Sequence, residues 1–308
     1  MQDKQPKVAI LLPVYNGERT LRATLESLLA QTFGDFELLI GIDGTKDGSK
    51  GIAESFQDPR IRIIEHPKNL GLANNVNALL AAVSPGIDLI AMAEQDDVYV
   101  PERLQWQVEV MQKQSDVGLV SGIAEFQGNG APVLFPGLLV YGQQFPQGEA
   151  LFRYLYEHQL KVVNTCILFR KSVHEKAGLN FRNTYGNFNV DWDYILRFSL
   201  VSGVYGIPKV LVRMNRRRKH HSVTTNKQGQ HKASRQLLKD FRTEFPNLIS
   251  QKDYQAALKQ HRKIELGHRS KLGIVAFSLF YAIIYRDFYF IEYIFNRVKK
   301  YKLNHDKN

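Results

Sequence analysis

The chain has little of several features that would place it in other protein classes. Cysteine occurs once in 308 residues, as Cys166, so no intrachain disulfide can form. The longest apolar stretch, residues 272–285, is shorter than the roughly 20 residues that a membrane-spanning helix needs. The first residues are polar and lack an apolar core of the signal-peptide type. We therefore expect a cytoplasmic protein, with the inner face of the membrane as an alternative location.

Acidic residues are also in the minority. Lys and Arg number 41 against 30 Asp and Glu, which gives a net charge of +11. A surface of this charge attracts polyanions such as nucleic acid, anionic lipid or phosphorylated small molecules. No helix-turn-helix, zinc-finger or RNP-like pattern accompanies the charge, which makes nucleic acid the weakest candidate.

The first 122 residues alternate between strand-like and helix-like segments. Residues 8–12 form a short apolar run before Pro13, which is typical of a strand buried on both faces. The other expected elements are strands at 36–42, 61–64 and 88–93, and helices at 16–31 (capped by Asn16), 71–83 and from 101 onward. This alternation predicts an α/β fold with a doubly wound, mostly parallel sheet flanked by helices.

The pattern loosens after residue 122. Five glycines and three prolines in residues 128–148 predict a long loop. The later elements are expected to be a helix at 149–159, a strand at 162–169, a helix at 189–202, a strand at 206–214, and basic, helical sequence from about 216. We expect one domain over 1–225, with halves of about 1–122 and 123–225, and a helical extension over 226–308.

Polar residues follow three of the predicted strands: Tyr15-Asn16-Gly17, Asp43-Gly44 and Glu94-Gln95-Asp96-Asp97. Ligands of such sheets bind just beyond the carboxyl ends of the strands, so these segments should converge on one crevice. Adjacent carboxylates suit Mg²⁺ or Mn²⁺, and such an ion could bridge a diphosphate. The alternative is a solvated loop in which Asp97 caps the next helix.

Two further acids are candidates for chemistry. Asp43 could accept a hydrogen bond from a nucleobase or a ribose, or it could form a simple turn. Asp191 begins a predicted helix, where the helix dipole alone favours an acid, but it could also act as a general base. Asp193 cannot face the same point as Asp191, because residues two apart diverge on a helix.

The densest basic run comprises Arg213, Arg216, Arg217, Arg218 and Lys219, followed by His220 and His221. A solvated face is the usual explanation of such a run. It could instead bind a diphosphate, with one histidine completing a metal site.

Together these segments resemble the family 2 glycosyltransferases, which have the GT-A fold, over roughly residues 7–225. The resemblance rests on the order and spacing of the following pieces: VAILLPVYNG at 8–17, SLLAQTF at 27–33, FELLI at 36–40, NLGLA at 69–73 with Asn77, QDD at 95–97 and PERL at 101–104. No single piece is decisive.

The resemblance implies an inverting transferase that moves a sugar from a nucleotide-sugar, a UDP-sugar in the first instance, to a hydroxyl of a glycan or lipid-linked saccharide. It implies these nucleotide-binding residues: Pro13, Tyr15, Asn16, Asp43, Asn69 and Asp96. Asp96 and Asp97 would hold Mn²⁺ or Mg²⁺, with His220 or His221 as a further ligand. Asp191 falls where the family places its catalytic base.

Four positions depart from the family pattern. They are Glu94 in place of an aspartate, Ile42 beside Asp43 where a second acid is common, Val76 where many members carry a basic residue, and Val190 before the base where an acid is frequent. These changes leave the identity of the donor open.

The C-terminal segment 272–302 is aromatic and then basic. This composition suits peripheral attachment to an anionic membrane, and equally a hairpin packed on the domain or on a second subunit. For the whole chain, polysaccharide or cell-envelope glycan synthesis is the expected setting. The alternatives are a nucleotide-sugar-binding protein without transferase activity and a nucleotidyltransferase.

Overall fold

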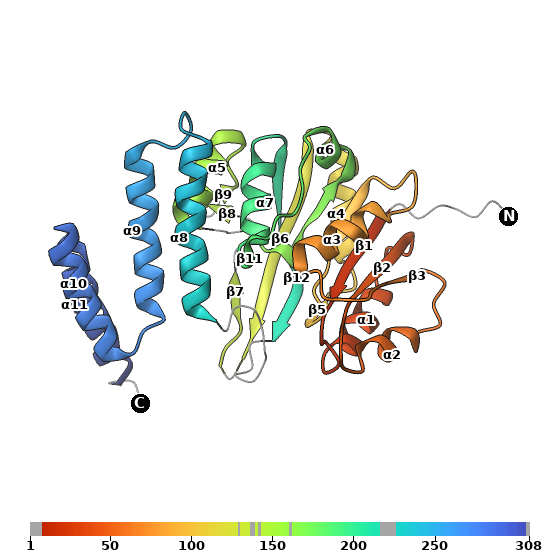
Figure 1. The fold of residues 1–308 in the computed structure, drawn as a ribbon, viewed down its shortest axis with the longest axis horizontal. Helices are drawn as coiled ribbons and strands as arrows, with labels where there is room; N and C mark the ends of the chain where they lie inside the picture. The colour runs from red at the N-terminus through yellow and green to blue at the C-terminus, as the bar shows by residue number, and fades with distance from the viewer. Residues whose placement is uncertain are drawn as a thin grey trace.

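The centre of the molecule is a nine-stranded sheet with helices on both faces (Figure 1). This computed structural model describes residues 8–128, 130–135, 139–140, 143–159, 162–215 and 226–305. The strand order is β3-β2-β1-β4-β10-β6-β12-β5, and β7 pairs with β6. The strands are β1 (Val8–Val14), β2 (Phe36–Asp43), β3 (Ile61–His66), β4 (Leu89–Met92), β5 (Asp97–Tyr99), β6 (Val117–Gln127), β7 (Val133–Phe135), β10 (Leu168–Arg170) and β12 (Gly203–Asn215).

The sheet is parallel in its first half and mixed in its second. β1 pairs in parallel with β2 and β4, and β2 pairs in parallel with β3. β10 runs antiparallel between β4 and β6, and β12 is parallel to β6 but antiparallel to β5. The predicted α/β class with a helical C-terminal extension is confirmed.

Helices cover the sheet through two apolar clusters on its opposite faces. Side chains alternate along a strand, so Leu11 of β1 joins one cluster and Ile10 joins the other. The first cluster includes residues of α3, α5, α7 and α8, and the second includes residues of α1 and α4. The helices are α1 (Leu21–Leu29), α2 (Ser49–Glu54), α3 (Leu72–Ala81), α4 (Arg103–Lys113), α5 (Gly148–His158), α6 (Lys171–Lys176), α7 (Val190–Ser199), α8 (Lys227–Glu244), α9 (Gln251–Gly267), α10 (Lys271–Tyr285) and α11 (Tyr289–His305).

The first helix begins later than predicted. Asn16 has φ 51°, in the left-handed region, and its side-chain oxygen accepts a hydrogen bond from the Lys46 amide at 3.1 Å. Asn16 therefore belongs to the loop after β1, where its side chain is bonded to the loop after β2, and α1 starts only at Leu21. The prediction that Asn16 caps this helix is wrong.

The predicted strand at 162–169 is also wrong in most of its length. A 3₁₀ turn, η1 (Asn164–Cys166), precedes the short strand β10. Side chains from outside hold this turn: the Tyr99 hydroxyl lies 2.5 Å from Thr165 Oγ1, and Gln107 donates to the Cys166 carbonyl at 2.7 Å. An apolar run alone cannot reveal such long-range partners.

The sequence pattern misses β6, an eleven-residue strand in the middle of the sheet. Glycines interrupt its apolar residues at positions where a neighbouring strand of the sheet approaches closely. A Cβ atom on Gly122 would lie 2.4 Å from Leu211 Cδ1 of β12. The loop expected at 128–148 likewise contains β7 and a small hairpin of β8 (Leu139–Val140) and β9 (Gln143–Gln144), so that prediction holds only in part.

The C-terminal helices differ in how they attach. Leu237 and Phe241 of α8 belong to the main core on one face of the sheet. α10 and α11 instead pack around Tyr281 and Phe290 in a small separate cluster, which also includes Leu266 of α9. Figure 1 shows these two helices beyond α9, at the edge of the molecule far from the N-terminus. No helix within the described ranges is long and apolar enough to cross a membrane.

Three histidines lie at the contact between α8 and α9. His231 Nε2 is 3.1 Å from His268 Nδ1, and the His231 and His261 rings are 5.1 Å apart. Burial lowers the pKa of all three, that of His261 to about 3. The folded protein therefore keeps His261 neutral at pH values where an unfolded chain would protonate it.

This cluster predicts a loss of stability in acid. The folded pKa of His261 is lower than the unfolded value of about 6.5, so its contribution is present above that pH and is lost as the pH falls towards about 3. At pH 5 the loss relative to pH 7.5 should be about 2 kcal/mol, at about 1.4 kcal/mol for each pH unit below 6.5. Denaturant unfolding at both pH values should show that His261→Asn loses less stability than the wild type. Parallel losses in the two proteins would contradict the assignment.

Candidate functional site

A cavity of about 350 Å³ lies at the carboxyl ends of β1, β2 and β4. All three predicted polar segments reach it, and α7 contributes Asp191. Of the residues predicted to bind the nucleotide, those that line the cavity are Pro13, Tyr15, Asp43, Asn69 and Asp96. Asn16 is not among the lining residues, because its side chain is held in the turn described above.

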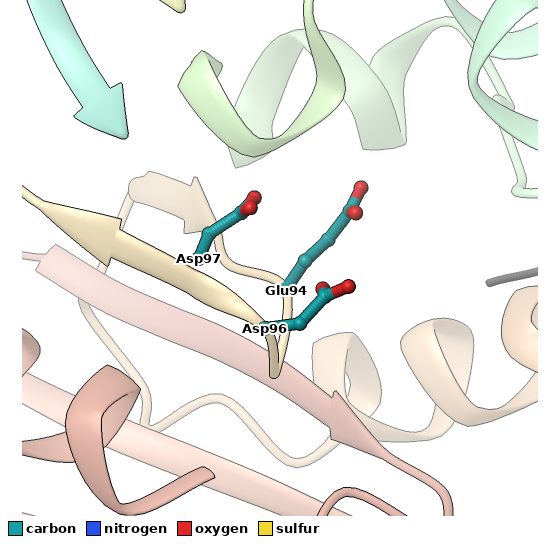
Figure 2. Close-up of side chains that lie close together, drawn as sticks. All are labelled: Glu94, Asp96 and Asp97. Carbon is teal, nitrogen blue, oxygen red and sulfur yellow. The ribbon is translucent and has the colours of Figure 1, made fainter. Parts of the chain in front are cut away.

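Three carboxylates lie close together where the chain passes from β4 to β5: Glu94 and Asp96 are in the turn, and Asp97 is the first residue of β5 (Figure 2). Ligand oxygens of Glu94, Asp96 and Asp97 all lie within 4.8 Å of one another. Asp97 is 2% exposed, and its buried Oδ2 atom accepts no hydrogen bond from the described part of the chain. Oxygen ligands in this number suit Mg²⁺ or Mn²⁺, so the residues fit a divalent cation.

Burial and neighbouring negative charge raise the pKa of two of these carboxylates, Glu94 and Asp97. Burial, followed by the charges of Asp96 and Asp191, raises the pKa of Glu94 to about 7. Burial and the charges of Glu94 and Asp96 raise the pKa of Asp97 well above its usual range. Mutual repulsion of this kind is relieved either by protons or by a bound cation.

A buried polar layer holds this turn in place. The fully buried Arg103 donates to the Met92 carbonyl at 2.7 Å, and its guanidinium lies 4.5 Å from the centre of the Tyr99 ring. The Tyr99 hydroxyl accepts from the Glu94 amide at 2.8 Å and contacts Thr165. These contacts tie β4, β5, α4 and η1 together behind the carboxylates.

Asp191 and Asp193 point to different places, as their spacing predicts. Asp191 lines the cavity and accepts a hydrogen bond from the Trp192 amide at 2.9 Å, while burial raises its pKa. Asp193 does not line the cavity and pairs with Arg197 at 3.0 Å. Of the two, only Asp191 is available to a ligand in the cavity.

Asp43 shapes the cavity wall through its backbone contacts. Its two oxygens accept hydrogen bonds from the amides of Leu70 and Gly71, at 2.7 and 3.0 Å. Gly71 has φ 81°, a conformation that glycine adopts without strain. Asp43 therefore fixes the loop that carries Asn69 to the cavity.

Gln95 joins the loops after β1 and β4. Its side chain accepts from the Tyr15 amide at 2.8 Å and donates to the Tyr15 carbonyl at 3.0 Å. Gly17 leaves room for it, because a Cβ atom there would lie 2.6 Å from Gln95 Oε1. The Tyr15 side chain remains 46% exposed at the cavity, where its ring can stack on a planar ligand.

Within the described residues the cavity is lined by four carboxylates and by no Lys or Arg. The carboxylates are those of Asp43, Glu94, Asp96 and Asp191. Val76 and Val190, which stand where the family pattern has charged residues, also line it. A diphosphate in this cavity would therefore need a cation that these lining residues do not supply.

Several lining residues were not predicted as site residues. Glu94 belongs to the carboxylate cluster although it stands where the resemblance implies an aspartate. Asn164 reaches the cavity from η1 and donates to Glu94 at 3.3 Å, and Gln230 reaches it from α8. The alternation of acids in Glu94-Gln95-Asp96 could have indicated Glu94, whereas no local signal indicates Asn164 or Gln230.

The predicted histidine ligands lie outside the described residues. His220 and His221, with the basic residues 216–219, belong to the segment 216–225. The chain enters that segment from the end of β12, where Met214 pairs with Asp97. The role of either histidine remains a prediction.

Comparison with known proteins agrees with this geometry. The family model described as Glycosyl transferase family 2 matches residues 9–178. EpsE of Bacillus subtilis (strain 168), which is named as a glycosyltransferase, is 33% identical over 159 residues, 48% of this chain and 56% of EpsE. The Escherichia coli UDP-Glc:alpha-D-GlcNAc-diphosphoundecaprenol beta-1,3-glucosyltransferase WfgD is 30% identical over 126 residues, 41% of this chain and 49% of WfgD. The chain thus spans about half the length of these two relatives.

A solved structure supports the fold over almost the whole chain. The mannosyltransferase PcManGT from Pyrobaculum calidifontis, in complex with GDP-Man and Mn²⁺, has a TM-score of 0.56 at 13% identity and covers 94% of this chain and 83% of its own. Identity this low shows the fold alone. With the family model matching more than half of the chain, the protein belongs to glycosyl transferase family 2 and has the GT-A fold.

Proposed function

We propose that this protein transfers a sugar from a nucleotide-sugar to an acceptor hydroxyl, with inversion at the anomeric carbon and with a divalent metal. The observation that carries this proposal is the cavity lined by four carboxylates and by no Lys or Arg of the described residues. Such a cavity repels a free diphosphate but accepts a diphosphate that arrives with a cation. Glu94, Asp96 and Asp97 would hold that cation.

The nucleotide would occupy the side of the cavity formed by the loops after β1 and β2. Tyr15 offers an exposed ring for stacking on a base, and Asp43 and Asn69 offer oxygen atoms to base or ribose donors. Asp43 keeps acceptor capacity, because each carboxylate oxygen has a second lone pair beside the one used by the backbone. A UDP-sugar is the donor that the name of WfgD supports.

Asp191 would act as the general base. The acceptor hydroxyl loses its proton to Asp191 and attacks the anomeric carbon, while the bond from that carbon to the diphosphate oxygen breaks and its electron pair leaves with the nucleotide. The raised pKa of Asp191 makes its carboxylate a stronger base than an exposed one. A bound divalent cation would neutralise the charge that develops on the departing diphosphate.

The acceptor would be a glycan or a lipid-linked saccharide used in cell-envelope polysaccharide synthesis. The support is the name of WfgD, which specifies a diphosphoundecaprenol-linked acceptor. Asp191 also favours transfer over donor binding alone, since a donor-binding protein has no need of a buried base in its cavity. A nucleotidyltransferase would instead release pyrophosphate from a nucleoside triphosphate.

Calorimetric titration with UDP, dTDP and GDP tests the donor site. We expect UDP to bind only when Mn²⁺ is present. We expect Asp96→Asn to weaken this binding by about tenfold or more, which is about 1.4 kcal/mol. Glu102→Gln is the matched control, because Glu102 is an exposed carboxylate near the same turn that does not line the cavity. Equal binding by both variants, or binding of UDP without metal, would contradict the proposed site.

Asp191→Asn tests the proposed base. The substitution keeps the size and the hydrogen bond to the Trp192 amide but removes the ability to accept a proton. Sugar transfer should fall by about 10²- to 10⁴-fold, while Mn²⁺-dependent UDP binding stays within about twofold of the wild type. The measurement pairs a UDP-release assay with the same titration. Undiminished transfer by the variant would exclude Asp191 as the base.

A further inference from the structure

Helix α10 is apolar on the side that faces solvent as well as on the side that is packed. Ile274 and Tyr281 are buried against neighbouring helices. The opposite stripe is exposed and large, with Leu272 85% and Ile283 74% exposed. Its members recur at helical spacing: Leu272, Val275, Leu279 and Ile283. A helix that is apolar all round is normally covered on every side, so this stripe indicates a binding surface.

A basic groove of about 520 Å³ adjoins this stripe, between α8, α9 and α10. Its cationic side chains are Lys232, Arg235, Lys239, Arg262 and Arg269. Glu265 is the single carboxylate in its lining, and it pairs with both Arg235 and Arg269, at 2.8 and 3.0 Å. The groove therefore keeps an excess of positive charge. None of the four stripe residues lines the groove, but Phe280 lines it and is 51% exposed, and at about 100° per residue Phe280 lies between the stripe and the groove. The groove therefore borders the apolar face of α10 along one edge.

The dimensions of α10 limit what can cover it. Its 15 residues span about 23 Å, which is less than the roughly 30 Å of a bilayer core. The helix is thus suited to lying along a bilayer surface and is too short to cross it. A symmetric dimer through the same surface would bring the groove cations of two copies together, which like charges disfavour.

We propose that α10 docks on the surface of an anionic lipid bilayer. The exposed stripe enters the boundary between headgroups and acyl chains, and the groove cations bind headgroup phosphates. Helix α8 connects this surface with the candidate active site, since Gln230 lines the cavity and Lys232 lines the groove. Docking would hold the cavity close to acceptors that are embedded in the membrane.

Flotation with lipid vesicles tests this proposal on the full chain. The wild type should float with vesicles of phosphatidylcholine and phosphatidylglycerol at 7:3 and should float far less with phosphatidylcholine alone. Ile283→Glu should abolish flotation, because it places a charge in the exposed stripe at a residue that is 74% exposed. Val201→Glu is the matched control: Val201 is a 46% exposed apolar residue next to the end of α7, outside this surface, and the variant should float like the wild type.

A double substitution tests the part played by the groove cations. Lys232→Gln with Lys239→Gln should weaken binding to the anionic vesicles by about fivefold for each charge removed, and added salt should reduce the difference from the wild type. Circular dichroism and thermal melting establish that each variant is folded.

Three results would overturn the proposal. They are flotation of Ile283→Glu at the wild-type level, equal flotation with both vesicle types, and a wild-type dimer in light scattering that Ile283→Glu dissociates without any lipid binding. The last would assign the stripe to a second copy of the chain. None of these readouts uses a nucleotide or a sugar, so their outcome is independent of the proposed transferase activity.

Discussion

The repulsion among the carboxylates of Glu94, Asp96 and Asp97 is the constraint on which the site depends. A folded chain tolerates such a cluster only where other contacts hold it in place, and here Arg103 and Tyr99 do so from the buried side. Neither places a positive charge in the cavity itself. The cluster is therefore a site prepared for a cation, and a cation is what a diphosphate needs in an acidic cavity.

The sheet order explains why this cluster meets the other parts of the site. β1 lies between β2 and β4, so the loops that carry Tyr15, Asp43 and Asp96 leave the sheet side by side. The antiparallel strand β10 and the 3₁₀ turn before it then bring Asn164 to the cluster, and α7 brings Asp191. α8 packs in the same core as the sheet, and its Gln230 lines the cavity. The helical extension therefore contributes to the site as well as to the surface at α10.

The sequence predicts those features that depend on local pattern. Apolar runs locate β1 and β2, and polar residues at strand ends correctly indicate that Asp43 and Asp96 share a cavity. Features set by distant partners are missed: Asn16 is held by the loop at 45–46, and Thr165 is held by Tyr99. A stretch such as 162–169 has the composition of a strand, but contacts from α4 and β5 hold residues 164–166 in a 3₁₀ turn. Roles that depend on a bound ligand, including that of Asp191, remain predictions.

Electron paramagnetic resonance of Mn²⁺ tests the central claim most directly, because it follows the metal without any sugar or acceptor. In the presence of UDP the wild type should remove about one equivalent of Mn²⁺ from the free-ion signal. Asp97→Asn should leave the free-ion signal at the level seen without protein, because the variant lacks one of the three proposed ligands. The variant should remain folded, because the substitution removes one negative charge from a crowded cluster. A free-ion signal that the wild type does not reduce, or one that Asp97→Asn reduces equally, would contradict the assignment of these carboxylates to a metal site.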